Sequence, residues 1–87
     1  MKINKLASNL ISGIDSYGNT YWYSYETMIA FQGKGQKLLI CENTWSQTTG
    51  KHLNMIDPDK SIRVSREFFK NAIAQYLGNS GFDMNQV

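Results

Sequence analysis

The chain has 87 residues, of which 41% are hydrophobic and 18% are charged, and its formal net charge at pH 7 is +2. This length predicts a single domain, and the two Trp, five Tyr and four Phe residues argue against a disordered chain. The apolar runs span only a few residues each, so no segment could cross a bilayer as a helix, and we expect a cytoplasmic protein without membrane contact.

The first fourteen residues carry two competing patterns. Their apolar side chains have helical spacing, whereas their Asn, Ser and Gly residues disfavour a helix. We predict a strand over about residues 9–15, preceded by a loose or helical lead-in. Residues 15–19 are rich in turn-forming side chains and predict a hairpin into the next strand.

Residues 20–31 predict a strand. Aromatic and polar side chains alternate over its first half, which is typical of a strand. Residues 28–31 are apolar throughout, which indicates that this part is covered on both faces. A bulge or a break at residues 24–27 would explain the change of pattern.

A tight glycine hairpin at residues 33–35 leads into a further strand over residues 36–42. A polar loop follows. A short helix is predicted from about Thr49 to Ile56, with Ser46 or Thr48 as its N-cap.

The C-terminal helix has the clearest pattern in the chain. After a brief extended segment over residues 60–64, Ser65 is predicted to cap a helix over Arg66–Leu77, in which apolar residues recur at helical spacing. Gly78 is well placed to end this helix. Residues 79–87 have few apolar side chains and are predicted to form a flexible tail.

The predicted fold is α+β, with one domain over residues 1–78. A three- to four-stranded antiparallel sheet is packed on one face by the short helix and by the C-terminal amphipathic helix. Because this arrangement leaves one aromatic sheet face open, a homodimer that covers that face is compatible with the sequence.

The sequence contains no recognisable catalytic or metal-binding motif. Cys41 is the only cysteine and lies in an apolar run, which is typical of a buried side chain. His52 is the only histidine, and no serine or cysteine has a diagnostic spacing from it. Gly50-Lys51 lacks the other residues of a phosphate-binding loop. We therefore predict a protein that is not an enzyme and that binds neither a cofactor nor a metal.

Two sets of residues are candidates for binding. The first set lies in one polar segment and could engage a partner: Trp45, Thr48, Thr49, Lys51 and His52. A hydroxyl-rich capping loop, with the indole ring packed on the sheet, is the simpler interpretation of this segment. The second set could stack on unpaired bases and contact phosphates: Tyr21, Tyr23, Tyr25, Lys37, Arg63, Arg66 and Lys70. A half-buried core or a dimer face is the simpler interpretation of the tyrosines.

Two stretches, Tyr23–Phe31 and Thr44–Asn54, resemble a family of small, uncharacterised proteins carried by bacteriophages and plasmids of Gram-positive bacteria. The resemblance covers about Tyr21 to Leu77. It implies an accessory protein of a mobile element that acts in the host cytoplasm. By analogy, such a protein contacts a host or phage protein, for instance as an inhibitor of a host defence system. We therefore expect a binding module, with single-stranded nucleic-acid binding as the alternative.

Overall fold

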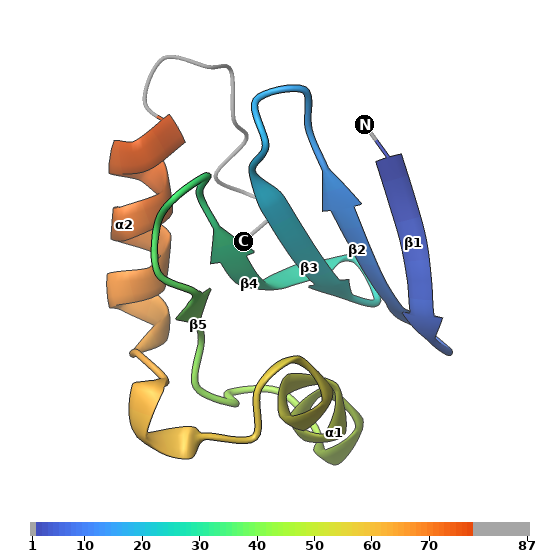
Figure 1. The fold of residues 1–87 in the computed structure, drawn as a ribbon. Helices are drawn as coiled ribbons and strands as arrows, with labels where there is room; N and C mark the ends of the chain where they lie inside the picture. Colours follow the sequence, from blue (N-terminus) through green and yellow to red (C-terminus); the bar gives the residue numbers. More distant parts are fainter. Residues whose placement is uncertain (1, 78–87) are drawn as a thin grey trace.

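The computed structural model describes residues 2–77. These residues form a five-stranded antiparallel sheet, in the order β1-β2-β3-β4-β5, with two α-helices (Figure 1). The elements are β1 (Lys2–Ala7), β2 (Leu10–Ile14), β3 (Thr20–Ser24), β4 (Thr27–Gln32), β5 (Leu39–Ile40), α1 (Gln47–Ile56), the 3-10 helix η1 (Lys60–Ile62) and α2 (Arg66–Leu77). The predicted α+β class and antiparallel sheet are confirmed, with five strands in place of three to four. None of the helices in residues 2–77 has the length and apolarity that a membrane span requires.

The N-terminal lead-in is a strand, which corrects the prediction of a loose or helical segment. β1 pairs antiparallel with β2, with Lys2 opposite Ile14 and Lys5 opposite Ile11. A two-residue turn of Ser8 and Asn9 connects the two strands. Pairing with β2 is a non-local interaction, and it overrides the helical spacing of the apolar residues in this segment.

The turn predicted over residues 15–19 is confirmed between β2 and β3. The Asp15 Oδ1 atom accepts hydrogen bonds from the backbone N–H groups of Tyr17, at 2.9 Å, and Asn19, at 3.0 Å. Gly18 has a φ of +86°, which glycine adopts without steric cost. The short-range side-chain bonds therefore define this hairpin as the sequence indicated.

The predicted break near residues 24–27 is a complete reversal of the chain. β3 ends at Ser24, and β4 begins at Thr27 and pairs antiparallel with β3. Trp22 lies opposite Ala30 and Tyr23 lies opposite Met28, so β4 contains an extra residue, Ile29. The bulge at this position explains why the stretch around Ile29 is apolar throughout, since successive residues there are buried.

The strand predicted over residues 36–42 is shorter than expected. Only Leu39–Ile40 pairs with β4, because a turn that is closed by a hydrogen bond from Gln36 N to Gly33 O takes up the residues before it. Beyond β5, Cys41 forms an isolated parallel bridge with Val64. η1 replaces most of the extended segment that was predicted over residues 60–64.

Both predicted helices are present. Ser46 is the N-cap of α1 and accepts a hydrogen bond from Thr49 N, so the helix begins two residues earlier than predicted. α2 has the predicted bounds, Arg66–Leu77. The predicted cap at Gly78, the tail over residues 79–87 and the domain boundary between them lie outside the described residues.

The helices contact different faces of the sheet, which corrects the prediction that both cover one face. α2 packs against one buried cluster, which contains Tyr21, Met28, Phe31, Cys41, Phe69 and Ile73. α1 packs against the other, which contains Leu10, Ile29, Ala30, Ile40 and Leu53. Leu39 and Cys41 contribute to the first cluster, whereas Leu38 and Ile40 contribute to the second, as expected for a strand with alternating side chains. The half-buried Trp45 contacts both clusters.

Candidate functional site

Two adjacent turns at one end of the sheet hold residues other than glycine in the left-handed region. Asn9, between β1 and β2, has a φ of 65°, and Tyr25, between β3 and β4, has a φ of 57°. The backbone N–H of Tyr25 donates to the carbonyl oxygen of Asn9 at 2.7 Å. Asn tolerates this conformation, whereas it costs a bulky residue such as Tyr about 1–2 kcal/mol. The fold therefore stores local strain at Tyr25, as is typical of functional segments.

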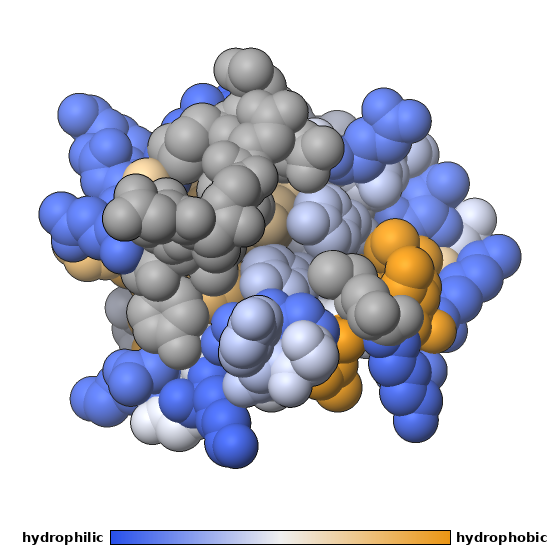
Figure 2. All heavy atoms as spheres, turned by 90° about the horizontal axis from the view of Figure 1, so that it is seen from above, coloured by the Kyte–Doolittle hydropathy of each residue, from blue (hydrophilic) through white to orange (hydrophobic). Residues whose placement is uncertain are grey.

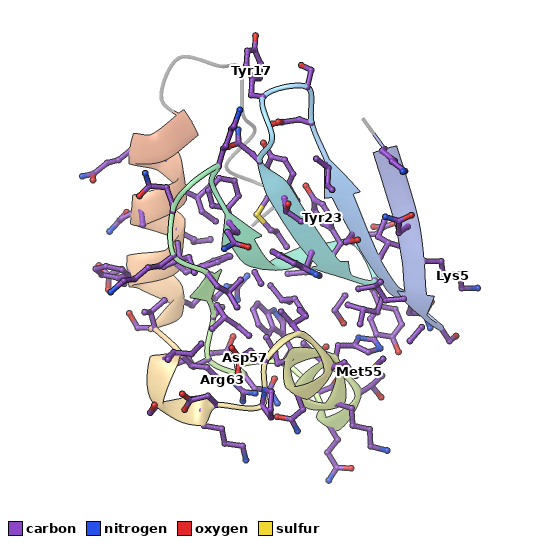
Figure 3. The ribbon with its side chains drawn as sticks, in the orientation of Figure 1. Lys5, Tyr17, Tyr23, Met55, Asp57 and Arg63 are labelled. Atoms are coloured by element: carbon purple, nitrogen blue, oxygen red, sulfur yellow. The ribbon has the colours of Figure 1, made fainter. Side chains whose placement is uncertain are left out.

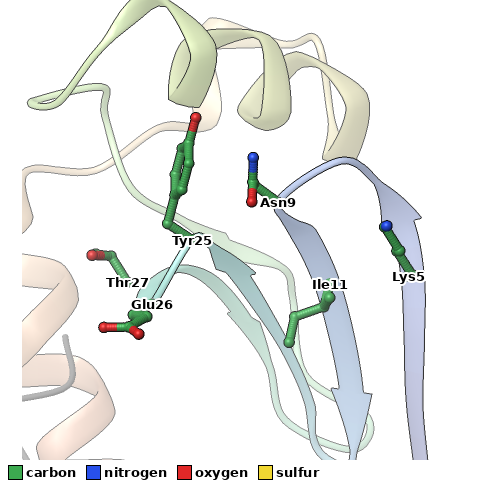
Figure 4. A pocket seen from close by; sticks show the side chains of 6 residues that line it. All are labelled: Lys5, Asn9, Ile11, Tyr25, Glu26 and Thr27. Atoms are coloured by element: carbon green, nitrogen blue, oxygen red, sulfur yellow. The ribbon is translucent and has the colours of Figure 1, made fainter.

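A pocket of about 670 Å³ opens beside these two turns (Figure 4). Its lining residues come from β1, β2, the two turns and the first residue of β4: Lys5, Asn9, Ile11, Tyr25, Glu26 and Thr27. The side chains of Asn9 and Tyr25 point toward α1. The Tyr25 side chain is 53% exposed. Because the pocket is wide, open to solvent and chemically mixed, it is better suited to side chains of a protein than to an enclosed small molecule.

A buried polar network lies behind the Tyr25 turn. The Ser24 Oγ atom lies 2.6 Å from His52 Nδ1 and 3.1 Å from Thr49 Oγ1. The Tyr25 ring lies with its centroid 6.2 Å from that of the His52 ring. These contacts connect the end of β3 to α1. They therefore fix the position of the turn that presents Tyr25 to the pocket.

The pair of Ser24 and His52 also has the functional groups that acyl transfer uses, a hydroxyl next to an imidazole. Ser24 is 2% exposed, however, and His52 is 4% exposed. Within residues 2–77, no carboxylate is hydrogen-bonded to His52. A substrate could reach the hydroxyl only if α1 moved away from the sheet. The geometry favours a structural role, in which buried polar groups satisfy one another.

The outer edge of β1 is the other notable feature of this end of the molecule. β1 is the terminal strand of the sheet, and no element of residues 2–77 pairs with its outer side. Ile3 is 61% exposed and Leu6 is 46% exposed. Seen from above, apolar surface gathers on the side of β1 and β2 (Figure 2). Lys5 projects away from the sheet on this strand (Figure 3).

The opposite edge of the sheet is occupied. Val64 lies beside β5, where Glu42 N donates to Val64 O at 2.8 Å and Val64 N donates to Ile40 O at 2.9 Å. These hydrogen bonds cover the backbone of the short edge strand. In the described part of the chain, β1 is therefore the edge that is available for a further strand.

The structure does not bring the predicted polar set together on one surface. Trp45 is half-buried between the two core clusters, and its ring lies 5.2 Å from the Arg66 guanidinium carbon. Thr49 and His52 point inward and bond to Ser24. Thr48 and Lys51 are exposed on the helix. Sequence reasoning missed Ser24, the residue to which His52 is bonded, because the two residues are far apart in the chain and no local spacing links them.

The tyrosines of the nucleic-acid set do not form one open face. Tyr21 is buried and its hydroxyl donates to Asp15 Oδ2 at 2.7 Å, whereas Tyr23 is half-buried against the α2 cluster. Tyr25 lies in the turn, outside β3. The four cations are also dispersed: Lys37 lines a groove near Ala72, Arg63 lines a pocket beside α1, and Arg66 and Lys70 are half-buried on α2.

A family model matches residues 1–71 and is described as a family of unknown function (DUF8033). The chain belongs to this family. The DUF8033 region includes all five strands, α1, both turns and the whole Ser24 network. No match was found among curated proteins or among solved structures.

The surroundings displace the pKa values of several titratable groups in the DUF8033 region, among them Cys41 and Asp15. Burial raises the pKa of the Cys41 thiol to about 11, and the neighbouring Glu42 adds to this effect. Burial also acts to raise the pKa of Asp15, but hydrogen bonds from Tyr21, Asn19 and Tyr17 outweigh it and hold that pKa below its ordinary value. Cys41 is therefore a protonated thiol at neutral pH and is not poised as a nucleophile. Among residues 2–77, no group of three or more His, Cys, Asp or Glu side chains is placed to hold a metal ion.

Proposed function

We propose that the protein is a non-enzymatic binding module that takes up an extended segment of a partner protein along the outer edge of β1. The observation that carries this proposal is the open six-residue edge, which leads directly to the pocket at Lys5 and Tyr25. In strand addition, backbone hydrogen bonds supply affinity and neighbouring pockets supply specificity. The occupied edge at β5 directs such an addition to β1.

The side chains of β1 indicate the chemistry of the partner. Lys2 and Lys5 are exposed and positively charged, and Ile3 and Leu6 are exposed and apolar. A segment that carries acidic and apolar side chains would complement this strand. A second copy of β1 is a poorer occupant, because the lysines of two such edges would repel each other across the new pair.

The sequence resemblance supports a proposal for where this partner is located. Residues 21–77 resemble accessory proteins of bacteriophages and plasmids, so we place the protein in the cytoplasm of a bacterial host. The partner is then a host or phage protein, and inhibition of a host defence system is one role that such binding would serve. The buried positions of Ser24 and His52 support binding over catalysis as the activity.

The proposal is tested by capture from a lysate of the bacterium that carries the chain, with and without nuclease treatment. We expect a protein that survives nuclease and that is lost when both edge lysines are reversed in Lys2→Glu/Lys5→Glu. Lys34→Glu reverses an exposed lysine in the β4–β5 turn and is the matched control, which should retain the partner.

Three outcomes would contradict the proposal. Capture of the same protein by the double variant would show that the β1 edge is not the binding surface. Recovery of nucleic acid alone would favour the single-stranded nucleic-acid alternative. Turnover of a nucleotide or nucleic-acid substrate that is lost in His52→Ala would contradict the non-enzymatic part of the proposal.

A further inference from the structure

The face of α1 that points away from the sheet lines a second pocket, of about 350 Å³. Gln47, Gly50, Lys51 and Asn54 recur at helical spacing and form this face. Thr49, His52 and Leu53 lie on the buried face of the same helix. Lys60 of η1 and Arg63 form the facing wall. The pocket is separate from the one beside β1, since the two have no lining residue in common.

The charges in this pocket are all positive. Lys51, Lys60 and Arg63 line it, and no Asp or Glu does. The nearby carboxylates are engaged with the backbone of the turn after α1, because Asp57 accepts from Asp59 N at 2.9 Å and Asp59 accepts from Ser61 N at 2.9 Å. Within residues 2–77, none of the three cations forms an ion pair. The residues that line the pocket therefore carry three formal positive charges and no negative charge.

Arg63 is held in position at the wall. Its Nη2 atom donates to Asn54 Oδ1 at 2.7 Å and lies 3.5 Å from the Asp57 carbonyl oxygen. Asp57 and Arg63 both lie in the segment that connects α1 to α2 (Figure 3). The Arg63 Nε atom is shielded from solvent and has no hydrogen-bond partner in the described residues. The guanidinium group is thus oriented before any ligand arrives, which lowers the entropic cost of binding.

Gly50 allows the loop before α1 to lie close to the helix, where Asn43 of this loop lines the pocket. Asn43 is fixed in this loop, where its Nδ2 atom donates to Ser46 O and its Oδ1 atom accepts from Trp45 N, both at 3.0 Å. A Cβ atom on Gly50 would lie 2.9 Å from Asn43 Nδ2. Glycine therefore permits a close approach that a larger residue would prevent.

We propose that this pocket binds the phosphate group of a small molecule. A phosphate carries up to two negative charges and several acceptor oxygens, which suit a guanidinium fork and two ammonium groups. A single carboxylate would leave most of the positive charge uncompensated. The volume lies at the low end of the range of about 300–1,000 Å³ that small-molecule sites occupy, which fits a pyrophosphate or nucleotide.

The test is an NMR titration of the full chain with inorganic pyrophosphate, adenosine triphosphate and a single-stranded oligonucleotide. We expect saturable shifts at Lys51, Asn54, Lys60 and Arg63 with both small ligands. Lys51→Gln/Lys60→Gln should lower the affinity about tenfold or more, the equivalent of one charge-assisted hydrogen bond. Both lysines are exposed, so the variant should fold, and an unchanged midpoint of thermal unfolding checks this.

Lys34→Gln, which removes an exposed lysine elsewhere, is the matched control and should bind as the wild type does. Three results would overturn the proposal. The first is the absence of saturable shifts with pyrophosphate and adenosine triphosphate. The second is an equal loss of affinity in Lys34→Gln, which would indicate attraction to net charge alone. The third is binding of the oligonucleotide without either small ligand, which would assign the surface to a nucleic-acid backbone.

Discussion

Ser24 and His52 should be energetically coupled through the hydrogen bond between them, and a double-mutant cycle measures this coupling energy. Ser24→Ala would leave His52 Nδ1 without its partner in the interior, at a cost of about 1–3 kcal/mol. His52→Ala would also leave a cavity where the ring packs, and large-to-small substitutions at such sites cost about 2–5 kcal/mol. The double variant should lose about 1 kcal/mol less unfolding free energy than the two single variants lose together, because the second substitution has no hydrogen bond left to remove.

Urea unfolding, followed by the fluorescence of Trp22 and Trp45, provides the assay. A domain of 87 residues has a free energy of unfolding of about 4–13 kcal/mol, so each cost is a measurable fraction of the total. Thr48→Ala, at an exposed position next to Thr49, is the control and should change the stability by less than about 0.5 kcal/mol. Additive costs, or a Ser24→Ala variant as stable as Thr48→Ala, would refute the network as the link between β3 and α1.

Three further predictions concern other parts of the fold. Because hydrogen bonds lower the pKa of Asp15 in the folded protein, its carboxylate stabilises the fold at pH values above its unfolded-state pKa, which is near 3.8. This stabilisation is lost as the pH falls through the folded-state pKa. Asp15→Asn should therefore lose less stability than the wild type on acidification in urea unfolding, and an equal loss would contradict the assignment. Cys41 should react with a thiol reagent at neutral pH only as fast as the protein unfolds; rapid labelling of the folded protein would contradict its burial and raised pKa. Replacing a glycine inside a helix with alanine usually raises the stability by about 1 kcal/mol, but Gly50→Ala should not give this increase. The gain should appear in an Asn43→Ala background, where the obstructing amide is absent, and its absence there would refute the proposed clash.

The parts of the fold that the sequence predicted correctly depend on local signals. α2 has the predicted bounds because its apolar residues recur at the period of a helix and a serine precedes it. The turn at residues 15–19 depends on Asp15 and Gly18, which act within a few residues of themselves. Ser46 is the N-cap of α1 for the same reason.

The parts that the sequence could not predict depend on contacts between distant residues. β1 forms because β2 lies beside it, although the spacing of its apolar residues is helical. The bulge at Ile29 lets successive residues of β4 be buried, and no local residue type marks it. The two helices pack on different faces of the sheet, and the neighbouring side chains of Leu38 and Leu39 contact different core clusters. The sequence permits this arrangement but does not require it.

The candidate site shows the same limit. The sequence indicates a polar candidate segment over Thr44–Leu53, but it does not distinguish the inward face of this segment from its outward face. Thr49 and His52 support the fold, whereas Lys51 lies on a pocket. The change of pattern at residues 24–27 indicated a break in the chain, but the left-handed backbone of Tyr25 and the open edge of β1 had no sequence signal, because both depend on how the strands pair in the sheet.

The most direct test of strand addition is amide hydrogen exchange of the protein alone and in complex with the partner captured from the lysate. Binding at the edge predicts that amides of β1 become protected in the complex, together with those of the Asn9 and Tyr25 turns. The exchange of α2 should stay the same. Protection that appears on α1 or α2 and leaves Lys2–Ala7 unchanged would contradict the account.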